Sequence, residues 1–155
     1  MTARHDARRT RRMTGPALAL AAALAGVVPA ATAAQDAALL QALQGVWCNS
    51  NDGGRTCWAY DEFFADGSFA ACGRTDDDPR PFRGGGPVSV SGRRMCYTVA
   101  FASDNFWLRP GGRYCTDILS IDARTHRYRD IDTQQEFTLH RVAHGATRCP
   151  ADNTP

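Results

Sequence analysis

The stretch Leu43-Gln44-Gly45-Val46-Trp47-Cys48 decides the fold, because it joins a short helix to a long β-rich region. Upstream of it, the sequence QDAALLQALQ at residues 35–44 predicts a short helix within 34–44 that places Leu39, Leu40 and Leu43 on one side. The glycine at position 45 ends that helix. Downstream, residues 46–49 predict a first strand, which sets the first tryptophan beside the first cysteine.

The first 33 residues predict a signal peptide that is removed from the mature protein. Residues 1–12 carry five arginines against one acid, and residues 16–29 are almost wholly Ala, Leu, Val and Gly. Ala31 and Ala33 are the small residues that a signal peptidase reads. An apolar run of this length falls short of the roughly 20 residues that a membrane span needs. We therefore expect a periplasmic or secreted protein without a membrane span.

Removal of the signal also changes the charge of the protein. The remaining chain keeps 13 arginines and 15 acids and has no lysine, so its net charge is close to −2 with neutral histidine. Its arginines are interspersed with acids rather than clustered on one face. A nucleic-acid partner is therefore not expected.

All six cysteines lie beyond the signal, and an even number in an exported domain predicts three disulfides. Six cysteines allow 15 pairings, which the sequence alone does not resolve. We favour Cys48–Cys57, which keeps the first two tryptophans on one face, and Cys96–Cys115 on adjacent strands, which leaves Cys72–Cys149. The spacing offers no zinc motif, and the acidic run 76–78 lacks the glycine and glutamate of a calcium loop. No metal and no cofactor are expected.

Evenly spaced turn signals beyond residue 45 predict eight antiparallel strands in a sandwich or barrel. The expected strands cover residues 46–49, 55–65, 68–74, 88–91, 94–102, 114–121, 127–131 and 136–142. Two long loops, 75–87 and 104–112, interrupt them. The second loop holds Phe106 and Trp107, which either recognise a ligand or partner or fold back over the core.

The turn at Asp66-Gly67 predicts which side chains face inward. A two-residue hairpin turn places Phe64 opposite Phe69, and side chains alternate along strands. The same alternation points the last-strand residues Phe137, Leu139 and Arg141 inward. The predicted interior is Trp47, Trp58, Tyr60, Phe64, Phe69, Tyr97, Val99, Phe101, Phe137 and Leu139, with Glu62 as an inward acid. We favour an ion pair of Glu62 with Arg141, and the alternative is that Glu62 anchors a ligand amine or accepts a proton.

Gly45-Val46-Trp47 after a short helix, together with Arg141 in the last strand, resembles the signature of lipocalin-like (calycin) barrels. The resemblance implies an eight-stranded up-and-down antiparallel barrel over residues 45–142, after a helix at 34–44 and before a tail at 143–155. It also implies that Gly45, Trp47 and Arg141 close one end, with the arginine over the indole. The chain departs from the family in its short length, its six cysteines and the lack of a helix after the last strand.

The chain carries no catalytic motif, so we expect a binding protein and not an enzyme. The leading hypothesis is a carrier of a small apolar ligand. Its expected ligand-binding residues are Trp58, Tyr60, Glu62, Phe69, Tyr97 and Phe101, with Trp107 at the mouth. The alternative is a protein-binding module, such as an inhibitor of a protease or lysozyme, that acts through loops 75–87 and 104–112. A purely structural role is a third alternative, and a monomer is the default expectation.

The size of the interior discriminates between the two binding hypotheses. A cavity of about 300 Å³ or more favours the small-molecule carrier. A packed interior with rigid exposed loops favours the protein-binding module.

Overall fold

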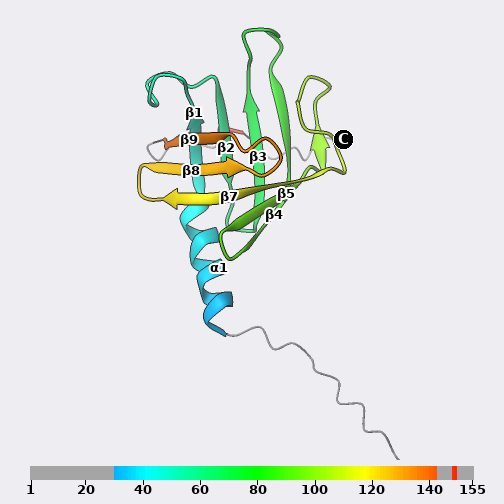
Figure 1. Cartoon of the computed structure of the whole chain (residues 1–155). Helices are drawn as coiled ribbons and strands as arrows, with labels where there is room; N and C mark the ends of the chain where they lie inside the picture. The colour runs from blue at the N-terminus through cyan, green and yellow to red at the C-terminus, as the bar shows by residue number, and fades with distance from the viewer. Residues whose placement is uncertain (1–29, 143–147, 150–155) are drawn as a thin grey trace, which may run out of the picture.

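The computed structural model describes residues 30–142 together with residues 148 and 149 (Figure 1). Most of the predicted signal peptide and of the predicted tail therefore lies outside the described residues. The described chain contains one helix and nine strands. They are α1 (Ala30–Leu43), β1 (Gly45–Asn49), β2 (Ala59–Phe63), β3 (Ser68–Gly73), β4 (Phe82–Ser91), β5 (Arg94–Thr98), β6 (Phe101–Ala102), β7 (Arg113–Ile121), β8 (Thr125–Asp130) and β9 (Glu136–Arg141).

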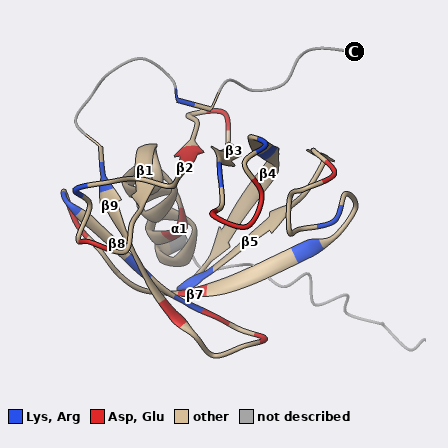
Figure 2. Ribbon diagram, turned by 90° about the horizontal axis from the view of Figure 1, so that it is seen from above, with Lys and Arg blue, Asp and Glu red and all other residues tan. Residues whose placement is uncertain are grey.

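Eight of these strands close into an antiparallel up-and-down barrel, as predicted. Each pairs with the next along the chain, and β9 returns to pair with β1. The short β6 is an addition, which pairs with β4 at its glycine-rich start. Seen from above in Figure 2, the strands form a ring, and acidic and basic segments are distributed around it.

The segment 82–87 was predicted as loop, and this was wrong, because β4 begins at Phe82. Its first half pairs with all of β3. The glycines at 84–86 let neighbouring side chains and backbone approach β4 closely. A Cβ atom at Gly84 would overlap the ring of Phe106, and one at Gly85 would lie 2.6 Å from the carbonyl oxygen of Phe69. Glycine inside a strand often marks a close approach of two backbone segments. Composition alone predicts a loop for such a glycine-rich segment.

The hairpin between β2 and β3 has a different register from the predicted one. The amide of Phe64 donates to the carbonyl of Ser68 (2.9 Å), and Gly67 adopts a φ of 80°. This is a three-residue loop with glycine in the left-handed position, so Phe63 and not Phe64 lies opposite Phe69.

A register change of one residue exchanges the two faces of a strand. Asp61 and Phe63 consequently face the interior, while Tyr60 and Glu62 face outward. Trp58, just before β2, is 39% exposed. The predicted inward placement of Trp58, Tyr60, Glu62 and Phe64 was therefore wrong.

The end of the barrel beside α1 is closed by Trp47 and Arg141, as the resemblance implied. Trp47 is fully buried, and its Nε1 donates to the carbonyl of Leu43 (2.6 Å). The guanidinium of Arg141 lies 4.0 Å from the centre of the indole and donates to the carbonyls of Gln44 (2.6 Å) and Ala42 (2.7 Å). Arg141 thus satisfies the carbonyls that the end of α1 leaves open.

Gly45 makes this arrangement possible. Its φ is 110°, a backbone conformation that favours glycine, and a Cβ atom there would lie 3.0 Å from Nη1 of Arg141. The predicted ion pair between Arg141 and Glu62 was wrong. Glu62 lies on the outer face of β2, where its Oε2 accepts hydrogen bonds from the amides of Arg148 and Cys149, both 3.0 Å long.

The three disulfides are the favoured pairs, Cys48–Cys57, Cys72–Cys149 and Cys96–Cys115. The third joins residues directly opposite each other on β5 and β7. The second holds the segment at 148–149 against the outer face of β2 and β3, where Glu62 binds its amides. All six cysteines are therefore oxidised.

Candidate ligand site

A cavity of about 80 Å³ lies inside the barrel and reaches the surface beside the loop between β6 and β7. Figure 1 places this loop at the opposite end of the barrel from α1. Apolar side chains from β2, β3, β5, β9 and this loop form most of the wall. Six polar side chains complete it, which are Asn49, Asp61, Tyr97, Thr116, His126 and Tyr128.

Asp61 is the acid of this cavity. It faces inward because it pairs with Trp47 on β1 and with Ala71 on β3. Its Oδ2 accepts one hydrogen bond, from Nδ2 of Asn49 at 3.2 Å, and it forms no ion pair with any described residue. Burial raises the pKa of Asp61 from 3.8 to about 6, although the bond from Asn49 opposes the shift. A carboxyl with such a perturbed pKa in a cavity is a candidate for a functional group.

Thr116 and His126 are buried polar residues on the same wall. Their relative exposures are 1% and 0%, and Oγ1 of Thr116 and both ring nitrogens of His126 have no hydrogen-bond partner among the described residues. Buried polar groups in proteins are ordinarily paired. Burial, and to a lesser extent the positive charge of Arg141, lowers the pKa of His126 to about 4, so its imidazole is neutral at neutral pH.

Tyr97 and Tyr128 add aromatic rings and hydroxyl groups to the wall. The ring of Tyr97 lies 5.1 Å from that of Phe69, and the ring of Tyr128 lies 5.3 Å from that of His126. Burial raises the pKa of both tyrosines above the ordinary value, and the negative charge of Asp61 adds to the effect. Both hydroxyls are therefore neutral across the ordinary pH range.

The mouth of the cavity is built from aromatic residues. Phe106 is buried and packs over Gly84 of β4, whereas Trp107 is 52% exposed at the opening. Trp107 contacts Phe82 with ring centres 4.8 Å apart and approaches Trp58 at 6.3 Å. One of the two loop aromatics thus folds back over the core, and the other remains available at the surface.

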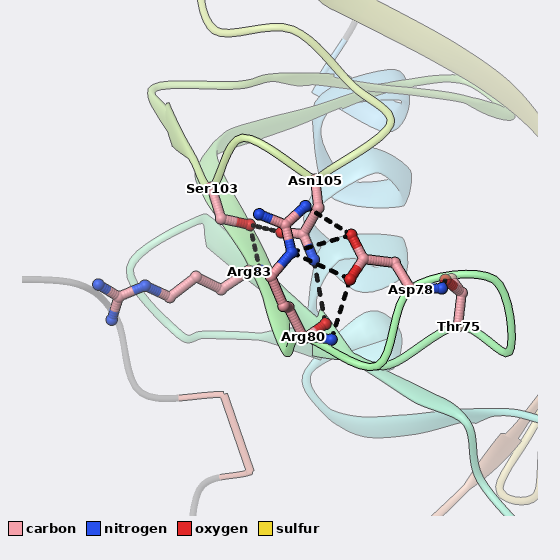
Figure 3. Close-up of polar contacts among 6 residues, drawn as sticks. All are labelled: Thr75, Asp78, Arg80, Arg83, Ser103 and Asn105. Carbon is pink, nitrogen blue, oxygen red and sulfur yellow. Dashed lines mark hydrogen bonds and ion pairs between the residues drawn. The ribbon is translucent and has the colours of Figure 1, made fainter.

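A polar network holds the mouth loop to the loop before β4 (Figure 3). Oγ of Ser103 accepts from the amide of Arg83 (3.0 Å) and donates to Oδ1 of Asn105 (2.8 Å). Nδ2 of Asn105 in turn donates to the carbonyl of Arg80 (3.0 Å), whose guanidinium pairs with Asp78 at 2.7 Å. The two long loops singled out from the sequence are therefore joined and held in one arrangement.

The structure brings together only some of the predicted ligand-binding residues. Phe69, Tyr97 and Trp107 line the cavity, whereas Trp58, Tyr60 and Glu62 lie outside it. Phe101 packs against Gly85 and does not line the cavity.

Sequence reasoning missed the polar wall of the cavity. Asp61 was missed because of the wrong register. Asn49 lies two residues after Trp47 on β1, so alternation from that predicted inward residue could have identified it. Thr116 lies two residues from Ile118 and His126 two residues from Tyr128, so each shares a strand face with an apolar or aromatic residue. Strand periodicity could therefore have identified both as inward polar positions.

The described residues contain no group of three or more metal-binding side chains and no helix long and apolar enough to cross a membrane. No protein-family model and no curated protein matches the chain.

Two solved structures are similar to the chain. One is a lipocalin-like protein from Bacteroides uniformis, with a TM-score of 0.51 at 15% sequence identity, over 65% of this chain and 99% of that one. The other is an uncharacterized protein from Bacteroides eggerthii, with a TM-score of 0.47 at 13% identity, over 64% and 99% of the two chains. With the closed eight-stranded barrel and the Trp47–Arg141 pair, the first comparison shows that this chain has a lipocalin-like fold.

Proposed function

We propose that the protein binds a small ligand inside its barrel and acts by binding rather than by catalysis. The observation that carries the proposal is the cavity, in which buried polar atoms without partners meet an apolar and aromatic wall. Ligand sites are typically apolar cavities with a few convergent polar groups and a residue of perturbed pKa. Asp61, Thr116 and His126 are those groups in this barrel.

The size of the cavity limits the ligand. It measures about 80 Å³, against about 300–1,000 Å³ for sites that hold drug-sized compounds. The cavity is thus smaller than the roughly 300 Å³ expected of a small-molecule carrier, and its size taken alone favours the protein-binding module. The unpaired polar atoms of its wall carry the proposal of interior binding, and they restrict the expected small apolar ligand to a compact compound that has a polar group on an apolar body. A lipid or a large pigment does not fit this interior.

We also propose that residues 1–33 direct export of the chain. Three disulfides are typical of proteins in an oxidising compartment, in keeping with the periplasm or the medium. The proposed ligand is then a compound found outside the cytoplasm.

Native mass spectrometry of the mature protein, purified gently from its own source, tests the proposal. We expect a co-purifying small molecule on the wild-type protein and its loss from Ala71→Leu, which fills the cavity from β3. Ala100→Leu, at an exposed position outside the cavity, is the matched control and should keep the ligand. A wild-type protein that carries no ligand and takes up none from a fragment library would argue against interior binding.

Protein binding is the second candidate function, and the exposed Trp58 and Trp107 favour it. Tryptophan is enriched among residues that dominate protein interfaces, and the joined loops 75–87 and 104–112 offer it a rigid support. This hypothesis predicts inhibition of a secreted protease or lysozyme that Trp107→Ala weakens tenfold or more. Equal potency of the wild-type protein and the variant would exclude this surface as the inhibitory one.

A further inference from the structure

We infer that the ligand is a small organic amine, whose ammonium group pairs with the carboxylate of Asp61. This inference rests on the proposed binding function and specifies the chemistry of the same cavity. It follows from three features of the wall, which are an acid without a cationic partner, further buried groups with unpaired acceptor atoms, and aromatic rings around both.

The first feature is the isolation of the carboxylate of Asp61. Oδ2 accepts one hydrogen bond from Asn49, and Oδ1 accepts none from the described residues. An ionised carboxylate has about four acceptor sites, and a buried one is costly without a cationic partner. No described arginine pairs with it, because Arg141 is directed to the carbonyls at the end of α1 and to Trp47.

The second feature is the set of acceptors on the same wall. An ammonium group has three N–H donors and no acceptor. A neutral imidazole and a threonine hydroxyl each offer one donor together with an acceptor, so His126 and Thr116 can accept from an ammonium group, whereas ionised Asp61 can only accept. A donor-rich head group therefore matches this wall better than a carboxylate or a phosphate does.

The third feature is aromatic. Phe69, Tyr97, Trp107 and Tyr128 all line the cavity. The faces of aromatic rings attract cations, and the attraction grows when the cation loses its water. The same rings supply an apolar surface for the carbon chain of an amine.

Negative charges act on the tyrosines of the wall, and the one positive charge, that of Arg141, acts on His126 from the closed end of the barrel. Both Asp61 and Asp130 act on Tyr97 and Tyr128 and raise the pKa of these hydroxyls. The remaining titratable group of the wall, His126, is neutral above its pKa of about 4. Between pH 5 and pH 7, Asp61 is therefore the lining residue whose charge changes.

This leads to a pH dependence of binding. An amine with an ordinary pKa near that of lysine, about 10, stays cationic throughout this range. Asp61 must be ionised to receive it, and its pKa in the empty protein is about 6. The affinity for the amine should therefore fall about tenfold between pH 7 and pH 5.

The experiment compares n-butylamine with n-butanol, which match in size and differ in charge. Binding to the wild-type protein, Asp61→Asn and Asp117→Asn is followed by NMR titration of backbone amides at pH 5 and pH 7. Asp117 is the control because it lies on the exposed face of β7 and pairs with Arg94 at 3.1 Å. We expect butylamine to bind in the barrel at least tenfold more tightly than butanol at pH 7, with that advantage lost in Asp61→Asn and kept in Asp117→Asn.

The outcomes separate this inference from the proposed function. Equal binding of amine and alcohol, unaffected by Asp61→Asn, would overturn the inference that the ligand is an amine and would leave interior binding in place. Amine binding that survives in Asp61→Asn, or that does not weaken at pH 5, would overturn the role of Asp61. If neither compound perturbs amides around the cavity, the amine inference fails, and interior binding is then decided by the native mass spectrometry and the fragment library.

Discussion

Replacement of Asp61 by asparagine is expected to stabilise the empty protein at neutral pH. Burial raises the pKa of Asp61 from 3.8 to about 6, which means that folding favours the protonated acid. A shift of about 2 units corresponds to about 3 kcal/mol of folding free energy. Asparagine has a similar shape, can still accept from Asn49 and does not ionise.

The sign of the effect follows from the two pKa values. The stabilisation from the protonated acid is fully present below about pH 4, and it is lost as the pH rises through about 6. Asp61→Asn should therefore equal the wild-type protein near pH 4 and exceed it by about 3 kcal/mol at pH 7.5.

His126 acts in the opposite direction over nearly the same range. Its pKa falls from 6.5 to about 4, so acidification destabilises both proteins through this residue. The contribution of His126 is common to both proteins, and it cancels in the difference between them.

The assay is urea unfolding of the ligand-free proteins with intact disulfides, at pH 4, 6 and 7.5. Free energies are compared between Asp61→Asn and the wild-type protein at each pH. A variant that is no more stable than the wild-type protein at pH 7.5 would refute the reasoning. A constant difference at all three pH values would also refute it, because it would show that the ionisation of Asp61 is not the cause.

Three further predictions concern the framework of the barrel. Arg141→Met should lower the free energy of unfolding by about 3 kcal/mol, because it removes two charged hydrogen bonds to the end of α1 and the cation over the indole, and a loss below about 1 kcal/mol in urea unfolding would contradict this. Gly84→Ala should cost about 1–3 kcal/mol and change the near-UV circular dichroism, since the new methyl group displaces the ring of Phe106; an unchanged spectrum would count against it. Replacement of both Cys72 and Cys149 by alanine should cost about 4 kcal/mol, because the bond spans 77 residues, and calorimetry with an unchanged melting temperature would rule this out.

The framework of the barrel could be predicted from the sequence because several local signals agree. Turn residues at regular spacing give the strand count, and the glycine before Trp47 marks the start of the sheet. Arg141 alternates in phase with Leu139, which is enough to point it into the barrel towards Trp47. Of the disulfides, Cys96–Cys115 follows from the order of neighbouring strands, whereas Cys57 and Cys149 lie outside the strands. The pair Cys48–Cys57 was correct although the reason for it was wrong, because Trp58 does not share the buried face of Trp47.

The wall of the cavity could not be predicted as well, because it depends on one turn. Asp66-Gly67 is compatible with a two-residue or a three-residue loop, and the adjacent residues Phe63 and Phe64 are equally apolar. Hydrophobic alternation therefore does not select the register. The one-residue difference exchanged Glu62 for Asp61 as the inward acid, and with it most of the predicted site on β2.

The pairing of β9 with β1 has a consequence for the order of folding events. The barrel cannot close until the last strand has been synthesised, since β1 pairs with β9 and Trp47 lies against Arg141. Until then one side of β1 presents an unpaired edge, which is the kind of strand that adds to other chains. Long-range pairing of this kind is slow. The bond from Cys72 to Cys149, which lies beyond β9, forms only after the whole barrel has been synthesised, so oxidation of this pair reports that the domain is complete.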